Sequence, residues 1–180
     1  MILTCAKGFK PPNQPPRDID IHTGLTAVVG DEGTGKTALL SAISASHQDV
    51  CFLDHSWAHA PQHLLNHTPQ AIWAHHAALY PRWQAKLSQA LTSALDLDAH
   101  THKALHMLST GSRRKVGLVS ALSAGAAVTC IDQPFDALDW PSINVLIEVF
   151  EDSALSTQRA WVIADYVARP ELNWQHTISL

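Results

Sequence analysis

Residues 30–37, GDEGTGKT, constrain the fold of this chain more than any other segment, because they match the pattern G-x-x-x-x-G-K-[ST]. A short apolar run, residues 25–29, precedes the segment, and residues 37–44, with apolar side chains at helical spacing, follow it. A strand, a glycine-rich loop and a helix in this order are the context that the pattern requires. The sequence therefore predicts a phosphate-binding loop between a strand and a helix.

The chemistry expected of this loop is the binding of a nucleoside triphosphate with Mg²⁺. Glycines let the backbone curl so that successive N–H groups and the helix N-terminus face phosphate oxygens. Lys36 can reach the β and γ phosphates and Thr37 can ligate Mg²⁺, whereas Asp31 and Glu32 can point outward, although their charge weakens anion binding. The expected loop contacts are Gly30, Asp31, Glu32, Gly33, Thr34, Gly35, Lys36, Thr37 and Ala38.

Asp132 is the second residue expected to serve the metal. It closes an apolar run, residues 126–131, where a carboxylate can hold Mg²⁺ through water opposite Thr37. A strand-ending Asp is equally typical of a turn or a cap when it stands alone. The two motifs together favour the metal role.

Strands and helices are expected to alternate along most of the chain. Helical periodicity is present in residues 113–122 and again after Pro141, which suits a first helical turn. The amphipathic residues 83–97 indicate a helical subdomain inserted at about residues 60–107. This order predicts an α/β fold, a mostly parallel sheet with helices on both faces. The expected strands are residues 25–29, 50–53, 126–131, 160–164 and 176–180.

Composition limits the domain count and the partners. A chain of 180 residues that is 46% hydrophobic and 16% charged is expected to form a single folded domain spanning residues 1–180. Lys and Arg total 12 against 16 for Asp and Glu, and no basic run is present, so a nucleic-acid partner is not favoured. No apolar stretch is long enough to cross a bilayer, and the N-terminus lacks a signal-type core, which indicates a cytoplasmic protein.

Two further features have structural meaning. Residues 10–17, KPPNQPPR, contain four prolines and are expected to form an exposed turn or link, with the fold proper beginning after them. Cys5, Cys51 and Cys130 are widely spaced and form no CxxC pair, which favours reduced, mostly buried thiols.

Three motifs later in the chain resemble those of the ATP-binding cassette (ABC) ATPases. Residues 108–112, LSTGS, followed by RRK and an apolar helix, resemble the family signature. Residues 126–134 resemble the Walker B strand, and residues 136–139, DALD, resemble the D-loop that follows it. The resemblance covers residues 25–166 and has the motifs in the family's order.

The resemblance implies a composite site formed by two chains. Ser109 and Gly111 would lie at a helix N-terminus, where the dipole and free N–H groups favour the γ phosphate held by the opposite subunit. Phe9 lies where the family often has an aromatic side chain that stacks on adenine. The implied partners are a second ABC subunit, in a homodimer or a heterodimer, and an integral membrane permease, with the chain peripheral on the inner face of the membrane.

The sequence departs from the family at the residues that assist hydrolysis. The glutamate that ordinarily follows the Walker B Asp is Gln133, whose amide can orient water but cannot accept its proton at pH 7. The switch histidine is replaced by Tyr166, preceded by Asp165. The family normally has a glutamine after the second strand of the nucleotide-binding domain, and here His55 is the nearest candidate for that position and for a metal contact. The stretch of residues 37–50 is shorter than in transporters of the family, which suggests a trimmed antiparallel β portion. We therefore expect Lys36, Asp132, Gln133 and Tyr166 at the catalytic position, with slow hydrolysis.

Two functions follow from these residues. The first is the ATP-binding subunit of an ABC transporter, coupled to a separate membrane subunit; the alternative is a non-transport ATP sensor that regulates a protein partner. A chromosome-maintenance ATPase would require a coiled-coil or zinc insertion and basic surfaces, which are absent. A small-molecule P-loop kinase leaves the signature and D-loop matches unexplained.

Histidines at four-residue intervals invite a metal interpretation. His55, His59, His63 and His67 would share one face of a continuous helix, but Pro61 argues against such a helix. Surface or partner-facing histidines are the default interpretation. The tryptophans of the same insertion are either interface anchors or core residues.

Overall fold

The computed structural model describes residues 1–180 and divides into two compact units. We call the first the sheet unit; it comprises Met1–Asp54, Ala126–Pro134 and Ile147–Leu180. The second, the helical unit, comprises His55–Gly125 and Phe135–Leu146. No helix in either unit is both long enough and apolar enough to span a membrane.

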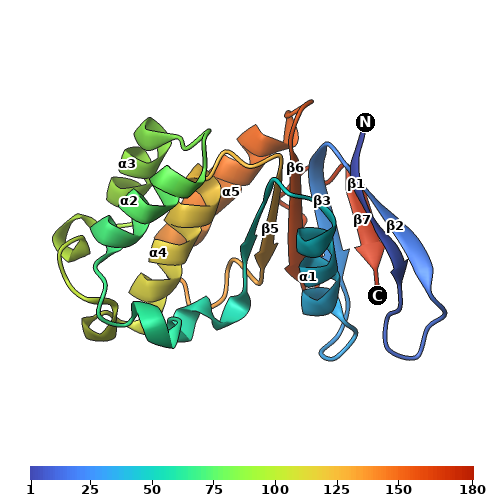
Figure 1. Cartoon of the computed structure of the whole chain (residues 1–180), viewed down its shortest axis with the longest axis horizontal. Helices are drawn as coiled ribbons and strands as arrows, with labels where there is room; N and C mark the ends of the chain where they lie inside the picture. Colours follow the sequence, from blue (N-terminus) through green and yellow to red (C-terminus); the bar gives the residue numbers. More distant parts are fainter. The chain divides into compact units, whose positions relative to one another are not determined.

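The sheet unit is built on five parallel strands in the order β4-β5-β6-β3-β7 (Figure 1). The mostly parallel sheet predicted from the sequence is therefore confirmed, and the terminal segment forms an edge strand as expected. The strands are β3 (Gly24–Val29), β4 (Val50–Leu53), β5 (Val128–Asp132), β6 (Ala160–Asp165) and β7 (His176–Ser179).

An antiparallel hairpin precedes this sheet, and the expectation that the fold begins after the proline-rich segment is wrong. Strand β1 (Ile2–Phe9) pairs with β2 (Arg17–His22), and the prolines occupy the loop between them. Ala6 and Ile21 are buried in the core, whereas their neighbours along the strands are exposed or partly exposed, so the hairpin is a folded part of the unit. The prolines therefore separate two paired strands.

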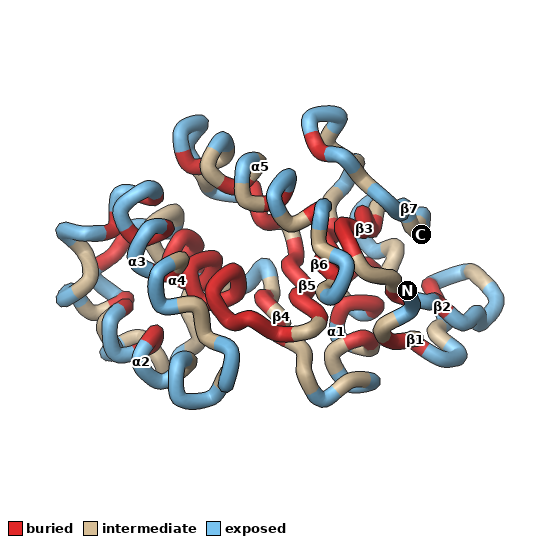
Figure 2. The backbone as a smooth tube through the Cα atoms, turned by 90° about the horizontal axis from the view of Figure 1, so that it is seen from above, coloured by how far each residue is buried: buried red, intermediate tan, exposed pale blue.

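Two helices cover opposite faces of the parallel sheet (Figure 2). Helix α1 (Lys36–Ser46) places Leu39, Leu40 and Ile43 against the buried side chains of β3, β5 and β6. Helix α5 (Trp140–Ala154) begins in the helical unit, and its later turns from Ile147 onward belong to the sheet unit. Its Phe150 ring packs against Trp161 of β6, with centroids 6.4 Å apart. Buried residues thus alternate between the two faces along β6.

The helical unit surrounds helix α4 (Thr110–Ser123), whose residues are buried from Arg114 to Ser123 (Figure 2). Trp73 of helix α2 (Pro69–Leu79) donates its indole N–H to the carbonyl of Val116, 3.1 Å away, so this tryptophan is a core residue of the unit. The remaining elements are η1 (His55–His59), η2 (Gln62–Leu64), α3 (Ala85–Ala94), η3 (Asp98–His100) and η4 (Leu105–Met107).

Candidate nucleotide-binding site

The glycine-rich loop lies between β3 and α1, as the sequence predicts. Lys36 begins α1 and is buried, with 7% of its surface exposed. Its ammonium Nζ donates to the carbonyl oxygens of Gly30 at 2.6 Å and Asp31 at 2.8 Å. The lysine therefore folds back along the loop, which places its positive charge at the amino end of α1. Asp31 and Glu32 are exposed, as expected for acidic side chains beside an anion site.

Gly35 is packed against the β1–β2 hairpin. Its φ of +99° is left-handed, and a Cβ built on it would lie 2.9 Å from Cδ of Pro12 and 3.7 Å from Cζ of Phe9. Only glycine fits this conformation and this space without strain. Phe9 thus lies beside the loop, where an aromatic ring can stack on a base, and Pro12 is a neighbour that no sequence signal indicated.

Thr37 and Asp132 meet at the end of β5. The Thr37 hydroxyl donates to Oδ2 of Asp132 over 2.5 Å, and Asp132 is 1% exposed. An alcohol oxygen and a carboxylate oxygen side by side fit the oxygen-rich coordination of Mg²⁺, which takes one or two protein ligands and completes its shell with water and phosphate. These two side chains are the ones that would hold the ion.

Gln133 follows Asp132 in a left-handed backbone conformation, with φ of +48°. Its N–H donates to the carbonyl of Ala164 over 2.8 Å. A positive φ is uncommon for a residue with a side chain. The contact fixes the backbone of Gln133 at the carboxyl edge of the sheet, directly after Asp132.

Tyr166 faces Lys36. The Lys36 Nζ lies 4.7 Å from the centroid of the Tyr166 ring, a cation–π distance, while the tyrosine is 50% exposed. Asp165, the last residue of β6, accepts the N–H of Tyr166 over 2.8 Å. Burial raises the pKa of the Asp165 carboxyl, and the Asp132 charge acts in the same direction. The sheet unit thus brings Tyr166 to the lysine of the loop.

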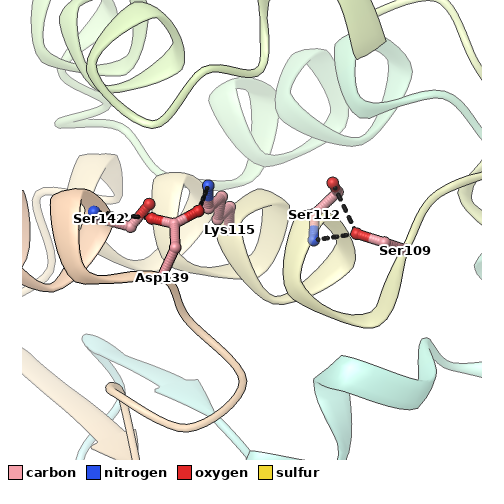
Figure 3. Close-up of polar contacts among 5 residues, drawn as sticks. All are labelled: Ser109, Ser112, Lys115, Asp139 and Ser142. Carbon is pink, nitrogen blue, oxygen red and sulfur yellow. Dashed lines mark hydrogen bonds and ion pairs between the residues drawn. The ribbon is translucent and has the colours of Figure 1, made fainter.

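The signature residues belong to the helical unit and cap α4 (Figure 3). Ser109 is the N-cap: its Oγ accepts the N–H of Ser112 over 3.0 Å and donates to Oγ of Ser112 over 2.9 Å. Ser109 and Thr110 are exposed, so the amino end of the helix is accessible. A Cβ on Gly111 would lie 2.7 Å from the carbonyl oxygen of Ala137, so a residue with a side chain would clash at this position.

Asp139 joins the D-loop segment to α4 (Figure 3). Its Oδ2 pairs with Nζ of Lys115 at 2.9 Å, and its Oδ1 accepts the N–H of Ser142 at 2.9 Å. Hydrogen bonds from Ser142 and then Lys115 lower the pKa of Asp139 to about 2. The sequence pattern did not predict this ion pair, because Lys115 and Asp139 are far apart in the chain.

The four-residue histidine pattern does not become one helix. His55 and His59 lie in η1, His63 lies in η2, and Ala60, with φ of +57°, and Pro61 separate the two segments. His55 is exposed, and its carbonyl accepts Nη1 of Arg114 at 3.4 Å. The break at Pro61 is the one expected from its missing N–H.

Comparisons with known proteins cover both the loop and the signature segment. A family profile described as ABC transporter matches residues 18–136. The chain is 31% identical over 134 residues to the cytochrome c biogenesis ATP-binding export protein CcmA of Zymomonas mobilis, covering 69% of this chain and 58% of the relative. It is 30% identical over 150 residues to the taurine import ATP-binding protein TauB of Pseudomonas putida, covering 68% of this chain and 54% of the relative.

A solved structure supports the fold. The ATP-binding subunit of an ABC transporter superposes on this chain with a TM-score of 0.76 at 15% sequence identity, covering 93% of this chain and 80% of that one. At this identity the likeness concerns the P-loop NTPase fold alone. The chain spans between half and three fifths of the length of the two curated relatives.

Proposed function

The chain belongs to the ABC transporter ATP-binding family, and from this premise we propose that it is the ATP-binding subunit of a transporter, binding Mg-ATP at a dimer interface. The observation that carries the proposal is the arrangement at the loop: Lys36 at the helix start, with the Thr37 and Asp132 oxygens 2.5 Å apart beside it. Bound Mg-ATP supplies the phosphate that is cleaved. Lys36 binds its phosphates, and Thr37 and Asp132 hold the ion.

The proposed second half of the site is the amino end of α4 from another copy. Ser109 caps the helix and Thr110 is exposed, so their N–H groups and the positive end of the helix dipole are available to a phosphate. Gly111, packed against the carbonyl of Ala137, keeps this helix start close to the D-loop segment. A site shared in this way makes nucleotide binding and dimerisation one linked equilibrium.

We propose that hydrolysis at this site is slow. The Gln133 amide can orient a water molecule, but it cannot accept a proton at pH 7. The exposed Tyr166, 4.7 Å from the lysine ammonium, offers a hydroxyl group and an aromatic face. Gln133 and Tyr166 stand where the family has a carboxylate and an imidazole, so the water loses the assistance that those two groups would give.

Transport requires a separate membrane subunit. We propose that this subunit binds the helical unit of the chain from the cytoplasmic side of the membrane. The two curated relatives are named for opposite directions, export and import. Substrate and direction are therefore assigned to that subunit. The replaced residues Gln133 and Tyr166 favour one alternative, an ATP-sensing regulator that acts on a protein partner without transport.

Sedimentation velocity with and without Mg-ATP tests the dimer. We expect Mg-ATP to convert the chain to a dimer, and we expect Thr110→Glu to prevent this, because the new charge repels the phosphate held by the facing copy. Glutamate in the first turn suits the helix dipole, so the variant should remain folded. Gln89→Glu, at an exposed position of α3, is the matched control and should dimerise normally. Equal dimerisation of both variants would refute the shared site.

Purification from native membranes separates the two functions. A transporter subunit should co-purify with a polytopic membrane protein, and the complex should survive a salt wash. Recovery of the chain with a partner that has no membrane span would favour the sensor.

A further inference from the structure

Four histidines line one cavity of the helical unit, where η2 leads into α2. The cavity has a volume of about 380 Å³, and its apolar lining is Leu64, Ala71 and Ile72. None of the residues assigned to nucleotide binding lines it. The histidines are His63, His67, His75 and His76.

The backbone of this wall is held in place by its neighbours. The carbonyl of His67 accepts the N–H of Leu105 at 2.9 Å, and the carbonyl of Leu65 accepts the N–H of His106 at 3.0 Å. Thr68 caps α2, because its Oγ1 accepts the N–H of Ala71 at 3.2 Å. The segment that carries His63 and His67 is therefore held by Leu105 and His106 and leads directly into the helix that carries His76.

His76 has a buried nitrogen atom with no partner. Its Nδ1 is buried and makes no hydrogen bond, which is unfavourable for a polar atom in such surroundings. An imidazole with an unused ring nitrogen can ligate a metal ion.

We propose that His63, His67 and His76 form a binding site for a divalent transition-metal ion such as Zn²⁺. Imidazole suits Zn²⁺, Ni²⁺ and Cu²⁺, with nitrogen atoms about 2.0–2.1 Å from zinc, and three protein ligands plus water complete a tetrahedral shell. His63 and His67 are exposed, and both line the same cavity as His76. His75 also lines the cavity, with its ring centroid 6.2 Å from that of His76, but neighbouring residues on α2 leave the helix about 100° apart, and we leave His75 out of the set.

This set differs from the one that the four-residue spacing indicates. His55 and His59 belong to η1 and do not line the cavity. The turn of α2 brings in His76, which lies four residues after Ile72, on the same helix face. The tertiary structure therefore groups histidines from two elements where the sequence pattern grouped them along one.

Calorimetric titration of the full chain with Zn²⁺ tests the site, with excess Mg²⁺ and no nucleotide present. We expect one Zn²⁺ per chain, and at least tenfold weaker binding by both His67→Gln and His76→Gln, with Co²⁺ giving the visible absorption of a four-coordinate ion. His59→Gln, an exposed histidine outside the cavity, should bind as the unchanged chain does.

The outcomes separate the possibilities. No Zn²⁺ binding, unchanged binding by His67→Gln, or loss of binding in His59→Gln would overturn the proposal. The exposed position of His67 makes its variant informative even if His76→Gln unfolds, as circular dichroism would show. Because no nucleotide is present, failure here leaves the ATP-binding proposal untouched, and failure of ATP binding leaves this site untouched.

Discussion

The Asp139 carboxylate is predicted to stabilise the helical unit through its charge. It accepts a hydrogen bond from the Ser142 N–H and pairs with Lys115, both at 2.9 Å. A pKa depressed from 3.8 to about 2 corresponds to an upper bound of about 2.4 kcal/mol. The Asp139 side chain is 56% exposed, so solvent screening reduces the expected contribution to about 0.5–1 kcal/mol.

Two substitutions separate the charge from the hydrogen bond. Asp139→Asn keeps an acceptor for the Ser142 N–H and removes the charge, so the free energy of unfolding should fall by about 0.5–1 kcal/mol at pH 7. Asp139→Ala also removes the cap of α5 and should cost about 1 kcal/mol more. Asp136→Asn, an exposed neighbour, is the control and should change stability by less than about 0.5 kcal/mol. Urea unfolding measures all three.

The pH dependence of the free energy of unfolding tests whether the charge of Asp139 stabilises the fold. The folded pKa of Asp139 lies below the unfolded value, so its contribution is present above about pH 4 and is lost as the pH falls toward 2. The difference between the unchanged chain and Asp139→Asn should therefore be constant from pH 7 to 5 and shrink below pH 4. Equal stability at pH 7, or a difference that does not shrink in acid, would refute the reasoning.

Three further predictions concern the nucleotide site. Gln133→Glu should raise the ATP turnover of the dimer at least tenfold by supplying a base, measured by phosphate release; Gln175→Glu should not. Thr37→Val should raise the Mg²⁺ concentration required for ATP binding at least tenfold, measured by titrating Mg²⁺ at fixed ATP, whereas Thr101→Val should leave it unchanged. Gly111→Ala should cost about 1–3 kcal/mol of stability, because its Cβ would lie 2.7 Å from the Ala137 carbonyl oxygen. An unchanged midpoint of urea unfolding would contradict this close contact.

The sequence predicted the local elements well where a motif and a periodicity agreed. The loop around Lys36 lies between a strand and a helix as expected, and Ser109 caps α4 as the resemblance implied. These features depend on residues that are close in the chain, so spacing alone can reveal them. The edge strand at the C-terminus was predicted on the same basis.

Features that depend on distant residues were missed. The β1 strand was missed because the fold proper was expected to begin only after the four prolines that follow it, whereas β1 pairs with β2 across them. The approach of Pro12 to Gly35 and the pairing of Lys115 with Asp139 join segments that only tertiary packing brings together. The histidine cavity has the same origin. Sequence periodicity contains no information about such contacts.

Calorimetric titration of the purified chain with Mg-ATP tests the central claim most directly. The account predicts one nucleotide bound per chain, with affinity reduced at least tenfold in Lys36→Ala, since this change removes the only cation of the loop. Lys86→Ala, an exposed lysine of α3, should bind ATP as the unchanged chain does. An absence of Mg-ATP binding, or equal affinity in the two lysine variants, would contradict the claim that residues 30–37 form the nucleotide site.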